Sequence, residues 1–209
     1  MKKEASSFKS ILVITLITVV AGLLLGLTHE VTAEPIRREQ EAARKRSQQA
    51  VFEDAASFEE IDISADLEKL SALFTENGLK NVRVNAVYRA KDSAGALLGY
   101  VVDSLSSEGY GGDIEIMSGI RNGEKPSLNG ISFLALSETA GMGMKAKEEP
   151  FASQFNGLDV SEHVVYTKSG KTLPNEIDAI SGATITSSAV TDAVNAAVLA
   201  AAYYTEVEK

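Results

Sequence analysis

The stretch VRVNAVYRAKDSAGALLGYVV, residues 82–102, decides the fold class of this chain. Apolar and polar residues alternate from Val82 to Tyr88, which is the pattern of a strand with one buried face. Asp92-Ser93-Ala94-Gly95 is typical of a turn, and the apolar run from Ala96 to Val102 returns as a second strand. We therefore expect an antiparallel hairpin. Further strands are predicted over residues 113–120, 130–136 and 164–167.

Helical patterns lie on both sides of these strands. Residues 187–205 place alanine and valine at helical spacing. Before the hairpin, the pattern between Val51 and Leu73 is amphipathic, and Asn77-Gly78 is typical of a helix C-cap. A short helix is predicted over residues 151–155. Strands in the centre with helices on both sides predict one α+β domain, with a central, mainly antiparallel sheet and flanking helices.

The N-terminal segment has the pattern of a transmembrane helix. Ser10 to Thr28 is a run of 19 residues without a charge, and Lys2, Lys3 and Lys9 precede it. At a rise of about 1.5 Å per residue, this run crosses the roughly 30 Å hydrocarbon core of a bilayer. A signal peptide cleaved after Val31-Thr32-Ala33 is the alternative. The run is longer than the usual signal core, which favours an uncleaved anchor.

The remaining organisation is built around this anchor. Residues 34–56 are charged and rich in alanine, with Pro35 near the first turn of a helix that leaves the bilayer. We expect four segments: a short tail at 1–9, the transmembrane helix at 10–28, a helical stalk or connector at 29–60 and the folded domain at 61–209.

Charge alone does not decide the topology. The N-terminal lysines favour a cytoplasmic N-terminus, but five basic residues follow the run within twenty residues: Arg37, Arg38, Arg44, Lys45 and Arg46. The export-like architecture and the lack of cysteine favour a single-pass protein of the inner cell membrane. Its N-terminus would lie in the cytoplasm and its domain outside.

Composition narrows the function. The chain has no cysteine, which excludes thiolate-held iron–sulfur clusters, disulfides and thiol catalysis. His29 and His163 are the two histidines, which disfavours a histidine-based metal or haem site. A redox role would therefore rest on an organic cofactor. The net charge of −9 argues against nucleic acid as a partner.

Two segments have patterns that suit a ligand. Residues 138–145, Glu-Thr-Ala-Gly-Met-Gly-Met-Lys, place two glycines around Met142, so the loop can lie flat against a planar ligand near Lys145. The alternative is a structural turn with Met142 as core filler. Residues 178–187, Asp-Ala-Ile-Ser-Gly-Ala-Thr-Ile-Thr-Ser, bring small residues and hydroxyls to a helix start, where free N–H groups favour an anion such as a phosphate ester. The alternative is helix capping by these hydroxyls.

Three other patterns have structural explanations. Ser169-Gly170-Lys171-Thr172 resembles the end of a phosphate loop, but Val165 stands where that loop needs glycine. Gly109-Tyr110-Gly111-Gly112 lacks dinucleotide-binding spacing, and we expect it to permit a tight bend or a close backbone approach. Glu162-His163 is interpreted as a surface pair.

Residues 178–184 match the signature Asp-x-x-Ser/Thr-Gly-Ala-Thr of proteins that carry FMN linked through its phosphate to threonine. This resemblance implies that Thr184 is the attachment point. It also implies that a dedicated flavin transferase installs the cofactor after export, and that Asp178 serves recognition by that transferase.

Over nearly its full length, the chain resembles the G subunit of the Rnf ion-translocating electron-transport complex. The shared features are the N-terminal helix and stalk, the Gly-Tyr-Gly-Gly element, the Glu-Thr-x-Gly-x-Gly loop, the Gln-Phe-x-Gly element at 154–157 and the flavin signature. The loop of that family usually reads Glu-Thr-Pro-Gly-Leu-Gly, so Ala140 and Met142 are departures. Both changes keep the glycines, and we expect the same backbone path with less rigidity.

The resemblance implies a role and a set of cofactor contacts. The chain would relay electrons between subunits of a complex that oxidises reduced ferredoxin, reduces NAD and moves ions, without substrate chemistry of its own. Beside Thr184, the residues expected to contact FMN are Glu138, Thr139, Gly141, Met142, Gly143, Lys145, Ser181, Gly182, Ala183, Thr186 and Ser187.

Three alternatives are kept. The C subunit of the sodium-pumping NADH:quinone reductase is a related family whose members are typically longer. A membrane-anchored binding module without cofactor would use the signature only as a helix cap. An exported hydrolase with Ser181 or Thr184 as nucleophile is disfavoured, because the chain has no Gly-x-Ser-x-Gly elbow.

Overall fold

The computed structural model describes residues 2–123 and 125–208. It divides into two compact units, one that ends at Ala43 and one that begins at Arg44. The first unit is part of helix α1, Lys2–Val51. This helix is long and apolar enough to cross a membrane, and none of its most apolar window is buried. The predicted transmembrane run therefore lies on a helix with the required length and exposure.

Helix α1 is longer than we expected. It begins at Lys2, so the predicted tail is helical from that residue on, and residue 1 lies outside the described residues. Pro35 lies inside the helix and not near the first turn of a separate one. The sequence after Pro35 is charged and contains Ala42 and Ala43, which favours helix on that side.

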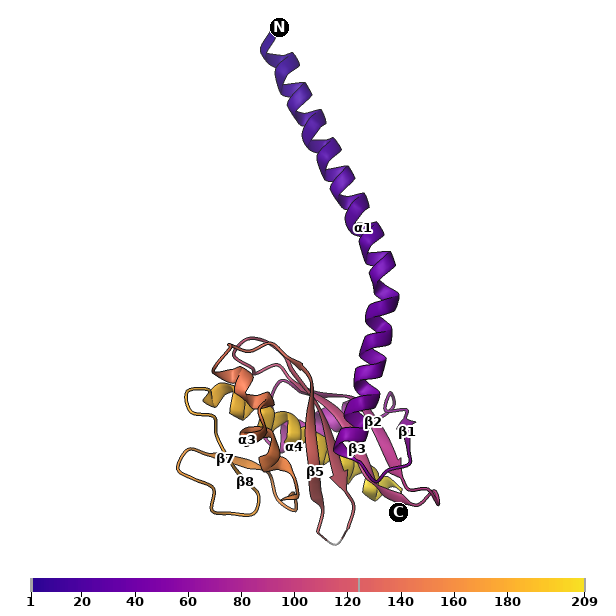
Figure 1. Cartoon of the computed structure of the whole chain (residues 1–209), viewed down its shortest axis with the longest axis vertical. Coiled ribbons are helices and arrows are strands. Elements are labelled where there is room, and N and C mark those ends of the chain that lie inside the picture. The colour runs from indigo at the N-terminus through magenta and orange to yellow at the C-terminus, as the bar shows by residue number, and fades with distance from the viewer. Residues whose placement is uncertain (1, 124, 209) are drawn as a thin grey trace. The chain divides into compact units, whose positions relative to one another are not determined.

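The second unit is built on a six-stranded sheet in the order β1-β2-β3-β4-β5-β6, in which every neighbouring pair is antiparallel (Figure 1). The strands are β1 (Ser57–Ile61), β2 (Val82–Lys91), β3 (Leu97–Ser106), β4 (Ile114–Arg121), β5 (Ser127–Leu136) and β6 (Leu158–Asp159). A second, parallel pair joins β7 (Val165–Thr167) to β8 (Glu176–Asp178). The helical elements are α2 (Leu67–Glu76), η1 (Gly143–Lys147), α3 (Glu149–Ala152), η2 (Ser153–Phe155) and α4 (Thr184–Val207).

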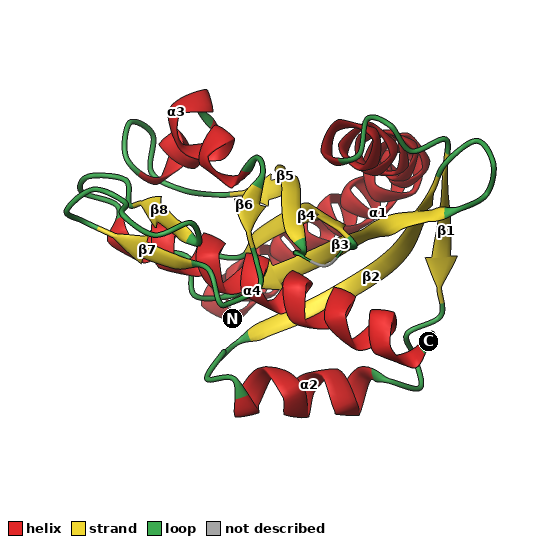
Figure 2. Ribbon diagram, turned by 90° about the horizontal axis from the view of Figure 1, so that it is seen from below, coloured by secondary structure: helices red, strands yellow, loops and turns green. Residues whose placement is uncertain are grey.

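The main core lies between α4 and one face of the sheet, with α2 beside α4 (Figure 2). Helix α4 presents small residues to the sheet, and its buried alanines include Ala189, Ala193, Ala197 and Ala200. On the sheet side, Tyr100, Val102 and Ile116 belong to the same core. Because these alanines are small, α4 can lie directly on β2, β3 and β4, which it contacts along its length.

A second, smaller core lies on the opposite face of the sheet, where residues 44–51 of α1 pack. Val51 and Phe52 are buried there with Val101 and Met117. A Cβ at Gly119 would lie 2.3 Å from the carbonyl oxygen of Val51, so only glycine permits this approach. The end of α1 is therefore part of the folded domain.

The predicted α+β class is confirmed, as are the hairpin, the strands near 113–120, 130–136 and 164–167, and the last helix. Asn77 is the C-cap of α2, as expected. The stretch predicted as stalk differs, because the compact unit already begins at Arg44 and residues 57–61 form β1. β1 is a short edge strand that contains Glu59 and Glu60. Charged residues are common on edge strands, and here they interrupt the alternation of apolar and polar residues by which a strand is predicted.

Candidate functional site

The start of helix α4 carries no side-chain cap. Its N-cap residue is Ala183, and none of the neighbouring hydroxyls forms a capping hydrogen bond. The first turn also contains no acidic residue. Gly182, with φ of +80°, makes the sharp turn that leads into the helix. The capping alternative is therefore wrong, and the first N–H groups of a long helix are open to an anion.

The hydroxyl of Ser187 is used inside this turn. It accepts a hydrogen bond from the N–H of Ile180 at 2.9 Å and donates one to the carbonyl oxygen of Ala183 at 3.0 Å. Ser187 is fully buried. This serine thus holds residues 180–183 against the helix and leaves Thr184 at the surface of the turn.

A cleft of about 570 Å³ opens in front of the first turn of α4. This volume lies in the range of ordinary cofactor sites. Its lining is mainly apolar and comes from three segments, the glycine-rich loop before β4, the loop after β5 and the start of α4. The lining residues are Tyr110, Glu138, Thr139, Met142, Gly143, Gly182, Ala183, Thr184, Ile185 and Thr186.

The loop after β5 forms one wall of the cleft. Met142 is 48% exposed, so it is not core filler. Gly143 is buried against α4: a Cβ there would lie 2.6 Å from Thr186 Oγ1 and 2.7 Å from Glu138 Oε2. Glycine is therefore required for the loop to reach the helix. The Glu-Thr-x-Gly-x-Gly pattern has a steric basis at its last position.

The Gly-Tyr-Gly-Gly element forms a second wall of the cleft through Tyr110. A Cβ at Gly111 would lie 2.0 Å from the carbonyl oxygen of Ser137, so this backbone packs directly on the loop after β5. The N–H of Tyr110 donates to Glu138 Oε1 at 2.9 Å, and the Tyr110 side chain is 72% exposed. The close backbone approach that we expected of these glycines is confirmed. Gly111 packs on Ser137 and Glu138, which lie far along the chain. The sequence around Gly111 therefore does not indicate which segment it contacts.

Five of the predicted site residues lie outside the cleft lining. Lys145 and Asp178 line a neighbouring pocket of about 410 Å³, Gly141 and Ser181 are exposed, and Ser187 is buried in the turn. Of the expected contacts, the cleft brings together Glu138, Thr139, Met142, Gly143, Gly182, Ala183, Thr184 and Thr186. It adds Tyr110 and Ile185, which were not among the expected contacts.

Asp178 has a structural environment in this neighbouring pocket. Gln154 accepts a hydrogen bond from the N–H of Asp178 at 2.7 Å and donates to its carbonyl oxygen at 3.2 Å. The Asp178 carboxylate accepts the N–H of Lys171 at 2.7 Å. The Gln-Phe-x-Gly element and the flavin signature therefore meet here, and Gln154 fixes the strand that leads to Thr184.

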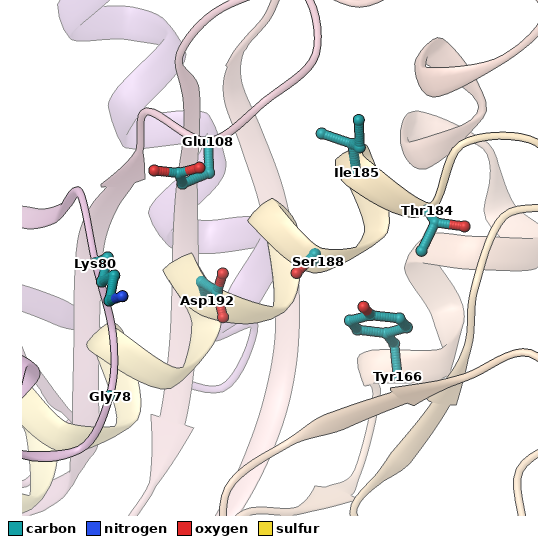
Figure 3. A pocket seen from close by; sticks show the side chains of 8 residues that line it. All are labelled: Gly78, Lys80, Glu108, Tyr166, Thr184, Ile185, Ser188 and Asp192. Atoms are coloured by element: carbon teal, nitrogen blue, oxygen red, sulfur yellow. The ribbon is translucent and has the colours of Figure 1, made fainter.

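A second cavity, of about 480 Å³, lies on another side of Thr184 (Figure 3). Ser188 and Asp192 follow Thr184 along α4, and Tyr166 comes from β7. Burial, and then the charge of Glu108, raise the pKa of Asp192. Lys80 supplies the one basic side chain of this lining. Two carboxylates make this cavity less suited to a phosphate than the cleft.

No group of three or more histidine, cysteine, aspartate or glutamate side chains among the described residues is arranged to hold a metal ion.

Comparison with known proteins agrees with this geometry. Residues 109–199 match the model of the FMN-binding domain family, a span that includes both walls of the cleft and Thr184. The G subunit of the Na⁺-translocating ferredoxin:NAD⁺ oxidoreductase complex of Acetobacterium woodii is 36% identical over 190 residues, which cover 90% of this chain and 88% of that protein. The G subunit of an ion-translocating oxidoreductase complex of Methanosarcina acetivorans is 32% identical, with 91% and 92% covered.

Among solved structures, the fold is similar to that of the C subunit of the Na⁺-translocating NADH-quinone reductase of Parabacteroides distasonis. The TM-score is 0.53 at 20% identity, and the alignment covers 78% of this chain and 94% of that one. The uncapped start of α4 suits a phosphate, and the mainly apolar cleft beside it suits a planar group. Together they fit a ligand that carries both.

Proposed function

The chain belongs to the family of G subunits of Rnf-type ion-translocating oxidoreductase complexes, and we propose that it carries electrons within such a complex through FMN bound covalently to Thr184. The observation that supports this most directly is the position of Thr184. It is the first residue of an uncapped helix and lines the cleft that the two glycine-containing loops form. A phosphate ester on its hydroxyl would lie at the open N–H groups of α4.

Bound FMN supplies one- and two-electron transfer, and the protein binds it, orients it and sets its surroundings. The apolar lining from Met142, Ala183 and Ile185 would hold the planar ring and exclude water from one side. Gly182 and Ala183 leave room beside Thr184 for a flavin transferase. In the attachment step, the Thr184 oxygen would bond to the flavin-side phosphorus of a flavin dinucleotide supplied to the transferase, and the hydroxyl would lose its proton. The P–O–P bond of the dinucleotide would break, and a nucleoside monophosphate would leave.

The partners and the topology are part of this proposal. The other subunits of the complex would donate and accept the electrons, and the complex would act as an ion translocase. The first unit of the chain would cross the inner membrane with its N-terminus in the cytoplasm. The FMN-bearing domain would then lie outside the cytoplasm, where a covalent bond keeps the cofactor from being lost.

The test is to express the full chain together with a flavin transferase, and to measure the intact mass and the fluorescence of the SDS-denatured band. We expect the mass increment of FMN on the peptide that contains Thr184, and its loss in Thr184→Ala. Ser188→Ala is the matched control, because it removes a nearby hydroxyl that lines the other cavity and not the cleft, and it should keep the increment. A colourless wild-type protein without the increment would support a binding module without cofactor, and fluorescence that persists in Thr184→Ala would refute the attachment site.

A further inference from the structure

Tyr110 is an unusual side chain in this domain, because it is aromatic, 72% exposed and fixed by its backbone. The glycines on both sides of Tyr110 lie directly against other backbone atoms. A Cβ at Gly109 would lie 2.2 Å from the carbonyl oxygen of Gly112, and one at Gly111 would lie 2.0 Å from that of Ser137. The loop therefore has little freedom to turn the ring into the core. An exposed aromatic ring held at the mouth of a cleft is suited to a planar ligand.

Glu138 joins the two walls of the cleft. One carboxylate oxygen, Oε1, accepts the N–H of Tyr110 at 2.9 Å. The other, Oε2, faces the position where Gly143 has no side chain, 2.7 Å from an added Cβ. The Glu138 side chain thus links the backbone of the Tyr110 loop to the loop that carries Met142. Its charge is already engaged by a backbone donor.

We infer that Tyr110 stacks on the isoalloxazine ring of FMN, and that Glu138 is a positioning residue that holds Tyr110 in place through its backbone N–H. This inference rests on the proposed function and goes further, because it assigns a wall of the site to a residue that was not among the expected contacts. Tyr166 offers an aromatic ring on another side of Thr184, but Glu108 and Asp192 share that cavity. The cleft contains a single carboxylate, that of Glu138, and a larger apolar lining.

Flavin fluorescence separates the two rings. A tyrosine in contact with an excited flavin gives it an electron and takes that electron back in the same cycle, which shortens the fluorescence lifetime, and phenylalanine is a far poorer donor. In the flavinylated full chain, we expect Tyr110→Phe to lengthen the lifetime several-fold. Tyr166→Phe is the matched control and should leave it unchanged. An effect of Tyr166→Phe without one of Tyr110→Phe overturns the inference.

The role of Glu138 needs its own variants. Glu138→Gln keeps an oxygen that accepts the Tyr110 N–H, so we expect the wild-type lifetime. Glu138→Ala removes the acceptor and should lengthen the lifetime as Tyr110→Phe does, and the double variant should add nothing further. If Glu138→Gln behaves like Glu138→Ala, the carboxylate acts through its charge and the positioning role is wrong.

The mass of the Thr184 peptide keeps the two proposals apart. A wild-type chain without the FMN increment overturns the proposed function and this inference with it. A chain that carries FMN at Thr184, with a lifetime that none of the Tyr110 and Glu138 variants changes, overturns this inference alone. Equal thermal unfolding midpoints of wild type and Glu138→Ala show that a longer lifetime reflects the cleft and not a loss of the fold.

Discussion

The ion cluster that fixes the end of α1 to the sheet should make the stability of the domain depend on pH. Arg44 pairs with Asp103 on β3, and its Nη2 lies 3.0 Å from Glu115 Oε1 on β4. The Asp103 side chain is fully buried. Burial raises the pKa of Asp103 to about 7 and outweighs the attraction of Arg44, and the nearby charge of Glu115 raises this pKa further. Burial lowers the pKa of Arg44, but the charges of Asp103 and Glu115 together outweigh it and raise this pKa.

The sign of the effect follows from proton binding. Asp103 binds its proton more tightly in the folded than in the unfolded chain, where its pKa is near 3.8. Its contribution to stability is complete below pH 4 and is lost as pH rises to about 7. At about 1.4 kcal/mol per pKa unit, the free energy of unfolding should fall by roughly 2–3 kcal/mol between pH 5 and pH 8 from this residue alone.

Urea denaturation of the full chain in detergent measures this slope, with the near-ultraviolet circular dichroism of the buried tyrosines as the signal. We expect Asp103→Asn to flatten the pH dependence by roughly 2–3 kcal/mol over this range, because asparagine does not titrate. Asp192→Asn is the control for a half-buried carboxyl whose pKa is also raised. An unchanged slope in Asp103→Asn would show that Asp103 stays ionised and that Arg44 outweighs burial.

Two further predictions concern packing. Gly119→Ala places a Cβ 2.3 Å from the carbonyl oxygen of Val51, and we expect the free energy of unfolding in urea to fall by roughly 1–3 kcal/mol; an unchanged midpoint would contradict the packing of α1 on the sheet. Gln154→Ala leaves the N–H and the carbonyl of Asp178 without their partners, which should cost roughly 1–3 kcal/mol. Faster hydrogen exchange at the Asp178 amide checks this, and full protection would argue against it.

Sequence predicted the parts of the fold whose signal is local. The alternation in β2, the turn at 92–95 and the spacing of alanine and valine in α4 each appear within one segment. β1 has no such signal, because Glu59 and Glu60 interrupt its apolar pattern and pairing with β2 makes it a strand. The end of α1 is similar: its residues look like stalk until Gly119, far along the chain, provides the surface on which they pack.

In the site, too, the sequence locates the segment, but the role of each side chain depends on the folded structure. Residues 184–188 offer four hydroxyls in five positions, and sequence alone does not separate their roles. On a helix, successive side chains point about 100° apart, so these hydroxyls face different surroundings. Ser187 turns inward to Ile180, Thr186 faces the cleft, Ser188 faces the second cavity, and Thr184 borders both. Of these hydroxyls, only that of Thr184 combines a place in the cleft lining with the first position of the uncapped helix, which gives a physical reason for the signature to end on this threonine.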